Sequence, residues 1–516
     1  MAPIEVNRSL GDASTVPLLR DSHDHDELER SSKENRQSSL QARARLYWLA
    51  AVLCCGALLF GYDSGLIGGV LTFQSFHSDF RFGAYGPRSE TTVSAIAVGT
   101  QQIGALIGCF AIWPVNNIYG RRMAIGACSL VFCLGVVLEL LNWHLLPLFY
   151  TGRVIAGLGV GGSSSVIPIY LSEMAPKEIR GQLGSCFQFM FTIGIFVSYW
   201  IDYAVGFMSP QTAQWQIPIA LQLVPGGLMG LGVLTLHESV RWLVANDDLH
   251  RASKSLEWIR AIPHNHEDRV VADELSDIKQ GIDEEAAAKA GFSFLELLEW
   301  SNAHRILLAV GIFLAQQSTG ATALAYFGPQ FFALIVGPGD KTLLLTGIFG
   351  LIKVVSCGFF IVFLSDRFGR KRLLFVGAAL MALGMFGTAV LIRSINLAHP
   401  ETITYSSSVS AKAIMTVALI YFTIIVFNLS WGPLPWPYAS EIFPTRIRES
   451  GVACGVGSQW LFNLIWSSAT PFLLAEIGGW GTFCLFGGMC VGVCAFVVFA
   501  LKETVNKTLE EINSMF

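Results

Sequence analysis

Residues 170–180 (YLSEMAPKEIR) and residues 438–448 (YASEIFPTRIR) share one pattern, because Tyr, Ser, Glu, Pro, Ile and Arg recur at a constant offset. A second pair repeats in the same order, with YGRRM at residues 119–123 and FGRKR at residues 368–372. Chance is a poor explanation for two such matches. Parallel repeats of this kind are typical of membrane folds made of two similar helical halves. The sequence therefore predicts two parallel halves with a site between them.

The composition is that of a chain that lies mostly in lipid. Of its 516 residues, 53% are hydrophobic and only 14% are charged, whereas a soluble domain carries about 25% charged residues. Twelve apolar stretches approach the roughly 20 residues that cross a bilayer as a helix. We therefore expect an all-α polytopic membrane protein with 12 transmembrane helices in two six-helix halves. The stretches lie near residues 46–70, 92–115, 123–141, 146–171, 183–203, 216–236, 305–334, 342–364, 373–393, 412–439, 451–474 and 481–501.

Polar segments frame the two halves. The first residues are rich in Ser, Asp, Glu, Arg and Asn and lack an apolar run, which indicates a disordered tail and not a signal peptide. The stretch ADELSDIKQGIDEEAAAKA at residues 272–290 is too polar to span a membrane and favours short helices in a cytosolic linker. The expected organisation is a tail at 1–45, a first half at 46–236, a linker at 237–304, a second half at 305–501 and a tail at 502–516.

Basic residues indicate the orientation of the chain. They gather in alternate loops, although Arg81, Arg88 and Lys341 are exceptions. Because cytosolic loops carry an excess of Lys and Arg, both termini are expected to be cytosolic. The clusters lie at Arg43 and Arg45, Arg121 and Arg122, Lys177 and Arg180, Arg367 to Arg372, and Arg446 and Arg448.

Several function classes receive no support. A net charge of -4 without a concentrated basic surface argues against nucleic acid as a partner. The eleven cysteines form no CxxC pair, so no metal or other cofactor is expected. The sequence contains no hydrolase triad and no phosphate-binding loop, so no motif predicts an enzyme. Four histidines in polar segments are read as solvated side chains, namely His23, His25, His264 and His266.

Asp63 lies inside an apolar stretch, where a charge costs at least about 2.5 kcal/mol. Its carboxyl should therefore be paired, protonated or functional, and Arg153 at the start of a glycine-rich stretch is the expected partner. Protonation of Asp63 would weaken that pair and couple proton binding to helix rearrangement. The alternative is a static ion pair that only fixes two helices together.

Six segments resemble the sugar porter branch of the major facilitator superfamily, and the similarity extends from about residue 46 to 511. The resemblance implies the major facilitator fold and alternating access between two halves at a midplane site. Together with the topology it implies a plasma membrane location, with the vacuolar membrane as the alternative. Within this family, proton-coupled members carry Asp and Arg at the positions of Asp63 and Arg153. The segments are FGYDSGLIGG, GRVIAGLGVGG, PIYLSEMAPKEIRG, QQSTGATALAYFGPQFF, SDRFGRK and WGPLPWPYASEIFPTRIR.

The resemblance also places a substrate site. Sugars need amides and hydroxyls for their hydroxyl groups and an aromatic side chain for their apolar face. Tyr326 and Phe327 are expected to close the site from outside. Membrane glutamines also serve as helix-packing hydrogen bonds, and this remains the alternative for each one taken singly. The matching positions are Gln188, Gln316, Gln317, Thr322, Trp436, Gln459 and Trp460.

Charges in the repeated loops are expected to act as latches of one conformation. Glu173 with Arg180, and Glu441 with Arg448, can tie neighbouring helices on the cytosolic face. Asp366 can pair with the arginines that follow it, Arg370 among them. In the first copy Asn117 replaces the acidic residue usual in the family, which weakens that latch. The alternative is that these charges only set the topology.

The substrate stays open between a neutral sugar and a sugar-like acid. Thr322 stands where many sugar porters carry a substrate-binding Asn, so a neutral hexose is not the default. Lys353 and Asn428 are unexpected inside apolar stretches. If Lys353 points inward it can bind the carboxylate of a uronate or quinate, whereas a snorkelling lysine indicates nothing about the substrate.

The sequence thus predicts a secondary transporter that imports a hexose, pentose, uronate or quinate with protons. Two alternatives are an exporter of a small secondary metabolite and a non-transporting nutrient sensor.

Overall fold

The computed structural model is almost entirely helical, and no strand occurs among the residues that it describes. Those residues are 20–81, 88–141, 143–175, 180–261, 267–289, 293–337, 339–364, 368–398, 410–444, 446–504, 511 and 515.

Six membrane-crossing helical segments form the first half, and their apolar lengths follow the predicted spans. The sixth segment consists of α7 and α8, which meet at Gln222. The short helix α2 (Gln74–Asp79) follows the first crossing. The bounds are α1 Arg20–Val70, α3 Arg88–Tyr119, α4 Arg121–Leu140, α5 Leu146–Met174, α6 Arg180–Gly206, α7 Thr212–Leu221 and α8 Leu223–Leu234.

The second half repeats this arrangement with broken helices. Its first crossing divides into three pieces, because the helix breaks at Gly320, whose φ is +79°, and again at Phe327, whose φ of −115° and ψ of 26° are not helical. Its fifth expected crossing, α19, carries many polar residues. The bounds are α12 Trp300–Ser318, α13 Ala321–Tyr326, α14 Gly328–Val336, α15 Asp340–Phe359, α16 Arg370–Ala398, α17 Ala411–Asn428, α18 Pro435–Glu441, α19 Arg448–Glu476 and α20 Gly478–Phe499.

Ten described helical segments are long and apolar enough to cross a membrane on their own. The two remaining predicted spans are the broken α12–α14 segment and the polar α19. Together they give the twelve crossings of the expected all-α fold.

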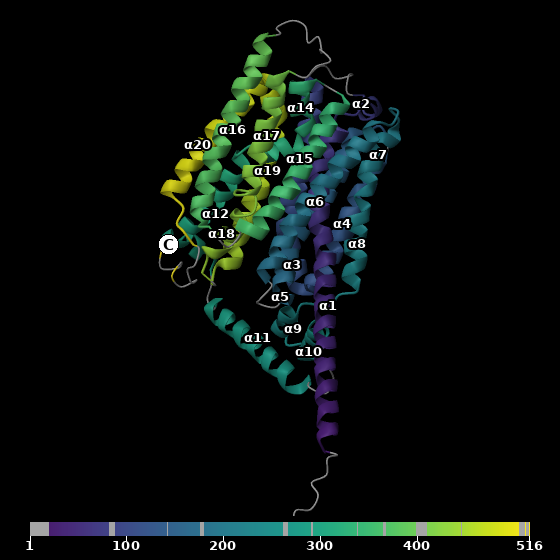
Figure 1. Cartoon of the computed structure of the whole chain (residues 1–516), viewed down its shortest axis with the longest axis vertical. Coiled ribbons are helices and arrows are strands. Elements are labelled where there is room, and N and C mark those ends of the chain that lie inside the picture. The colour runs from purple at the N-terminus through teal and green to yellow at the C-terminus, as the bar shows by residue number, and fades with distance from the viewer. Residues whose placement is uncertain are drawn as a thin grey trace, which may run out of the picture.

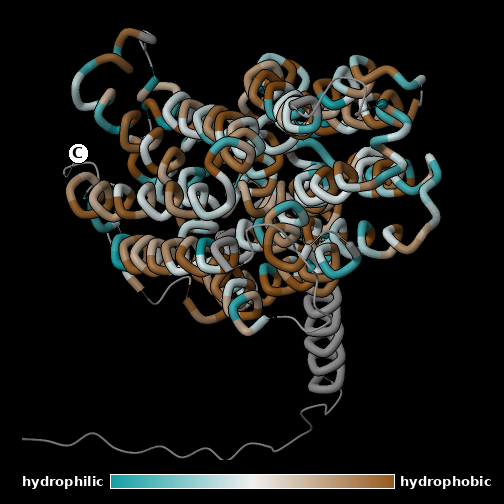
Figure 2. The backbone as a smooth tube through the Cα atoms, turned by 90° about the horizontal axis from the view of Figure 1, so that it is seen from above, coloured by the Kyte–Doolittle hydropathy of each residue, from teal (hydrophilic) through white to brown (hydrophobic). Residues whose placement is uncertain are grey.

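The two halves stand side by side, the first from purple to blue and the second from green to yellow (Figure 1). Helix α3 packs against α19 and α6 packs against α15, so both pairs join the halves. Large apolar side chains such as Leu231, Leu383 and Val390 are exposed, as a lipid-facing surface requires. Figure 2 shows hydrophobic residues over most of the helical tubes in the view from above.

The two ends of the molecule differ. The end that carries the start of α1 and the linker is called the tail side, and the opposite end, which carries α2 and α14, is called the far side (Figure 1). Helix α1 begins at Arg20, whereas the sequence predicts disorder up to residue 45. Extending an existing helix costs far less than nucleating one, and Glu, Leu, Gln, Ala and Arg in this segment are good helix formers. The apolar part of α1 is Leu40–Val70.

The linker forms three helices and a 3₁₀ turn on the tail side. Arg446 anchors it to the second half through two bonds of 2.8 Å to the carboxylate of Glu296. These bonds lower the pKa of Glu296, so the anchor is lost as pH falls into the acid range. The side chains of the four polar-segment histidines lie outside the described residues. The elements are α9 Val240–Ala245, α10 Leu249–Arg260, α11 Glu267–Lys289 and η2 Phe294–Leu298.

Glycines let α3 and α5 approach each other closely. A Cβ on Gly161 would lie 2.0 Å from the carbonyl oxygen of Ala105, and one on Gly157 would lie 2.3 Å from that of Gln101. Backbone atoms cannot yield at such distances, so the glycine-rich stretch of α5 is a packing surface.

We expect Gly161→Ala to lower the stability of the detergent-solubilised protein by about 1–3 kcal/mol, because the added methyl group forces α5 away from α3. Gly227→Ala is the matched control, since a Cβ at Gly227 meets nothing within 4 Å. Thermal unfolding followed by fluorescence-detected gel filtration measures both. Equal melting temperatures for the two variants would contradict the close packing.

Candidate functional site

An ion pair is buried in the first half. Arg153 Nη1 of α5 lies 2.7 Å from Asp63 Oδ1 of α1, and the two side chains are 1% and 3% exposed. Arg153 Nε also donates to the carbonyl of Ala97 in α3 at 3.2 Å. One guanidinium therefore links α1, α3 and α5, and the structure brings together the two residues predicted as a pair.

A second carboxyl stands beside the same arginine. Glu139 Oε2, at the end of α4, lies 4.0 Å from Arg153 Nη1, and its side chain is 1% exposed. Glu139 was not among the residues predicted from the sequence, although it is an acidic residue near the end of an apolar stretch. Membrane-buried acids are functional candidates by default.

Buried polar atoms without a hydrogen-bond partner gather on two helices that join the halves, α3 and α19. Unsatisfied buried polar atoms are rare in native proteins, and they indicate a place for a ligand or for water. Gln459 and Trp460 were predicted there, while Gln101, Gln102 and Asn463 were not. Besides Asn116 Oδ1 near the end of α3, the atoms in the described part of the chain are Gln101 Oε1, Gln102 Oε1, Gln459 Oε1, Trp460 Nε1 and Asn463 Oδ1.

Three predicted polar residues of the second half are engaged within the protein. Gln316 donates to the carbonyls of Trp431 and Gly432 at 2.8 and 3.1 Å, where the chain between α17 and α18 is not helical. Thr322 donates to Gln317 Oε1 at 2.7 Å. These contacts pre-organise the broken helices around the region between the halves.

Asn428 and Gln188 differ in their environment. The amide of Asn428 donates to the carbonyl of Ile424 within its own helix at 2.8 Å. Gln188 is half-buried on α6. The structure thus gives Asn428 a local partner and places Gln188 on a helix that faces the second half.

Aromatic side chains flank the same region. The ring of Trp460 lies 5.0 Å from the ring of Phe60, so α19 and α1 meet at this point. Trp436 packs edge to face on Phe313 with centroids 5.2 Å apart. Phe60 also lies beside Phe191 of α6, with ring centroids 4.6 Å apart, so rings from α1, α6 and α19 meet where the halves join.

Lys353 of α15 is buried and does not snorkel to an interface. Its ammonium lies 6.0 Å from the ring centroids of Phe191 and Phe349, at the limit of a cation–π contact. No carboxylate in the described chain lies within ion-pair distance of it. A buried cation without a protein anion is a candidate for binding an anionic group.

The far side is closed by α13. The Tyr326 hydroxyl accepts from Gln102 Nε2 at 2.8 Å and lies 3.5 Å from Ser64 Oγ, so it joins α13 to α3 and α1. Tyr199 of α6 donates to the carbonyl of Ala325 at 2.5 Å. Phe327 is buried beside Tyr326. Both predicted gating aromatics therefore sit at the junction of the halves.

Ion pairs on the tail side of the first half stay within that half. Arg121 at the start of α4 pairs with Glu173 at the end of α5 at 2.8 Å, and Ser239 donates to the same carboxylate. The side chain of Arg180, the predicted partner of Glu173, lies outside the described residues.

The second half repeats the arrangement. Arg370 at the start of α16 pairs with Glu441 at the end of α18. Arg448 instead donates to the carbonyl of Phe443, so the expected pair of Glu441 with Arg448 is not formed. The reason is geometric: the chain turns between α18 and α19 and directs Arg448 to the turn itself. Asp366 lies outside the described residues.

Two further glutamates cap helices at equivalent places. Glu238 accepts from the backbone N–H groups of Arg121 and Arg122, and Glu503 accepts from those of Arg370 and Lys371. A carboxylate at a helix N-terminus is favoured by the helix dipole. Burial raises the pKa of Glu238, and these N–H bonds counteract that rise. In the sequence, these two helix-capping glutamates are indicated by the similar segments HESV at 237–240 and KETV at 502–505.

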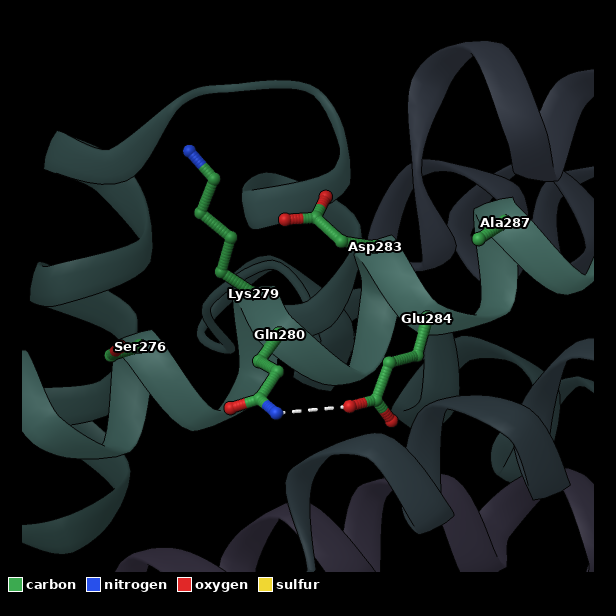
Figure 3. A pocket seen from close by; sticks show the side chains of 6 residues that line it. All are labelled: Ser276, Lys279, Gln280, Asp283, Glu284 and Ala287. Atoms are coloured by element: carbon green, nitrogen blue, oxygen red, sulfur yellow. Dashed lines mark hydrogen bonds between the residues drawn. The ribbon is translucent and has the colours of Figure 1, made fainter.

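A surface depression on α11 is unrelated to these residues. Ser276, Lys279, Gln280, Asp283, Glu284 and Ala287 line it from one helix face (Figure 3). Gln280 donates to Glu284 at 2.9 Å, one turn away. It is a solvated helix face on the tail side.

Comparison with known proteins identifies the family of this chain. Residues 49–516 match the family described as sugar (and other) transporter. The chain belongs to this sugar transporter family. The quinate permease of Emericella nidulans is 34% identical over 481 residues, with 92% of this chain and 88% of the relative covered. A probable quinate permease of Aspergillus terreus is 35% identical over 480 residues, with 92% and 87% covered.

Solved structures of this transporter family agree with the fold. The xylose transporter XylE from E. coli, in a partially occluded inward open conformation, matches with a TM-score of 0.75 and 25% identity, covering 90% of this chain and 100% of XylE. The proton:xylose symporter XylE bound to 6-bromo-6-deoxy-D-glucose matches with a TM-score of 0.74 and 26% identity, covering 92% and 99%.

We expect Glu173→Gln to destabilise the tail side of the first half by about 1.5–3 kcal/mol, since it removes a largely buried charge-assisted pair. Asp248→Asn is the control, because its pair with Arg251 is exposed and Asn caps α10 equally well. Melting temperatures in detergent report the difference. A loss in the control as large as in Glu173→Gln would refute the assignment.

Proposed function

We propose that this member of the sugar transporter family imports a sugar-like carboxylic acid of the quinate class together with protons. The observation that carries proton coupling is the buried Asp63–Arg153 pair, and the observation that favours an acid is the buried Lys353. The permease names of the relatives and the proton:xylose symporter among the structural matches support the same reading.

Proton coupling follows from the electrostatics of the pair. In low dielectric an ionised carboxylate needs its cation, whereas a protonated one does not. A proton on Asp63 therefore releases Arg153 and frees α1 from α5, and loss of the proton restores the link. Since α1 also contacts α13 of the second half, this release reaches the gate at Tyr326.

The polar groups between the halves suit a hydroxylated ring. Amide oxygens of Gln459 and Asn463 can accept from hydroxyl groups, and the ring of Trp460 can cover an apolar ring face. The ammonium of Lys353 would bind the carboxylate of the substrate through a charge-assisted hydrogen bond. A quinate-like acid combines all three features.

Alternating access assigns the two sides of the molecule. The tail side carries the basic loops, so it is assigned to the cytosol, with both termini inside and the plasma membrane as the location. The far side, closed by Tyr326 and Tyr199, is then the extracellular gate. Opening needs these contacts between halves to break, while the ion pairs on the tail side move with each half.

Uptake of labelled quinate by cells lacking their own carriers should be several-fold faster at acidic than at near-neutral external pH. Asp63→Asn should reduce proton-driven uptake to background, because a neutral amide cannot exchange a proton. Glucose, xylose and galacturonate uptake, measured in parallel, define the selectivity. If none of these four solutes is taken up, the protein is not an importer of them, and an exporter or a nutrient sensor is favoured.

Lys353→Met should raise the KM for quinate about tenfold or more, since a charge-assisted bond contributes about 1.5–3 kcal/mol. The exposed Lys341 at the start of α15 provides the control Lys341→Met. Competition between quinate and xylose for the transporter shows whether the loss concerns the acid alone. An unchanged KM for quinate in Lys353→Met would exclude the role of this lysine.

A further inference from the structure

Arg153 has two carboxyl neighbours and uses only one of them. Its Nη1 is 2.7 Å from Asp63 Oδ1 and 4.0 Å from Glu139 Oε2. Within the described chain, both oxygens of Glu139 and the Nη2 of Arg153 are buried without a hydrogen-bond partner. The guanidinium thus keeps an unsatisfied donor, and the carboxyl that lies 4.0 Å from it keeps two unsatisfied acceptors.

The fold makes a place for Glu139 against α5. A Cβ on Gly152 would lie 2.7 Å from the Cγ of Glu139 and 2.8 Å from its backbone nitrogen. Only the absence of a side chain at the residue before Arg153 lets the glutamate lie here. Glu139 is also one residue from the extracellular end of α4, whereas Asp63 is seven residues from the end of α1.

Other charges near the cluster are few. Helices α7 and α8, which pack on α4, contain no Asp, Glu, Lys, Arg or His. On α3 the nearest such residues are Arg88 and the exposed Glu90 at its extracellular end, and on α2 they are His77 and Asp79. On α5 and α1 they are Arg153 and Asp63. On α6, which packs against α1, the acid is Asp202, whose buried carboxyl lies against Gly69 of α1 and forms no ion pair with Arg153 in the described chain. The cluster around Arg153 therefore consists of two carboxyls and one cation.

Two carboxylates and one guanidinium would leave one negative charge uncompensated in a low-dielectric site. Such a charge is neutralised by proton binding, as in other pairs of carboxyls that share a site. One proton makes the cluster neutral, and it can reside on either acid. Arg153 then pairs with the acid that is still ionised.

We propose that Glu139 is a second proton-coupling residue, which takes the proton from the extracellular side and passes it to Asp63 while Arg153 moves from Asp63 to Glu139. The O–H bond at Glu139 breaks as the O–H bond at Asp63 forms, and the charge of the cluster stays zero. Arg153 is never left without an anion, so the release of α1 costs little electrostatic energy. This inference rests on the proton coupling proposed above.

The test compares wild type with Glu139→Gln and Glu139→Asp, using quinate uptake over a range of external pH and quinate counterflow at equal pH on both sides. Counterflow needs binding and alternating access without a proton gradient, so it reports a folded and mobile protein. Glu90→Gln, an exposed acid on the same side, is the control.

Glu139→Gln should shift the midpoint of the uptake profile by about one unit towards acid pH, because the second negative charge that draws the proton is gone. Glu139→Asp should restore most of the wild-type profile, and counterflow should persist in both. A wild-type midpoint in Glu139→Gln, or a loss of uptake that is equal at every pH and matched in counterflow, would overturn the inference. Uptake by wild type that does not depend on pH would overturn the proton coupling itself, and this result is distinguishable because it appears without any substitution.

Discussion

The structure depends on one electrostatic constraint: a charge inside the membrane must be matched by an opposite charge or removed by a proton. Arg153 meets this constraint by binding Asp63 and the carbonyl of Ala97, and thereby joins α1, α3 and α5. The glycine-rich stretch that begins just before it brings α5 so close to α3 that the guanidinium reaches both neighbours. The close packing of α3 and α5 is therefore what allows the buried charge of Arg153 to be matched.

The internal repeat gives the two halves the same construction on the tail side. In each half an arginine at the start of a helix pairs with a glutamate of the neighbouring segment, as in Arg121 with Glu173 and Arg370 with Glu441. In each half a second glutamate caps that helix, Glu238 or Glu503. These contacts hold each half together as a body. Contacts between halves lie instead on the far side, at Tyr326 and Tyr199, and along two helix pairs, which is the division that a rocking motion requires.

The sequence contained most of the fold because hydropathy and charge position are local signals. Twelve apolar stretches, the repeat and the Asp63–Arg153 pair all emerged from it, and the family match confirms the transporter class. Other features depend on distances between segments. The pairing of Glu441 with Arg370 instead of Arg448 follows from the path of a turn, and the place of Glu139 beside Arg153 follows from the bare Cα of Gly152. Helicity before residue 45 was missed because composition alone does not show that a helix can extend from a membrane span. The roles of the substrate-site residues stay predictions.

Proton movement in proteoliposomes that contain a trapped pH-sensitive dye tests directly whether transport is coupled to protons through Asp63. An inward quinate gradient should acidify the lumen with the wild-type protein, because each substrate molecule carries a proton with it. With Asp63→Asn the lumen should stay at its starting pH, although quinate exchange continues across the same membrane. Acidification of equal extent in Asp63→Asn, or quinate entry without proton movement in the wild type, would mean that Asp63 does not couple protons to transport.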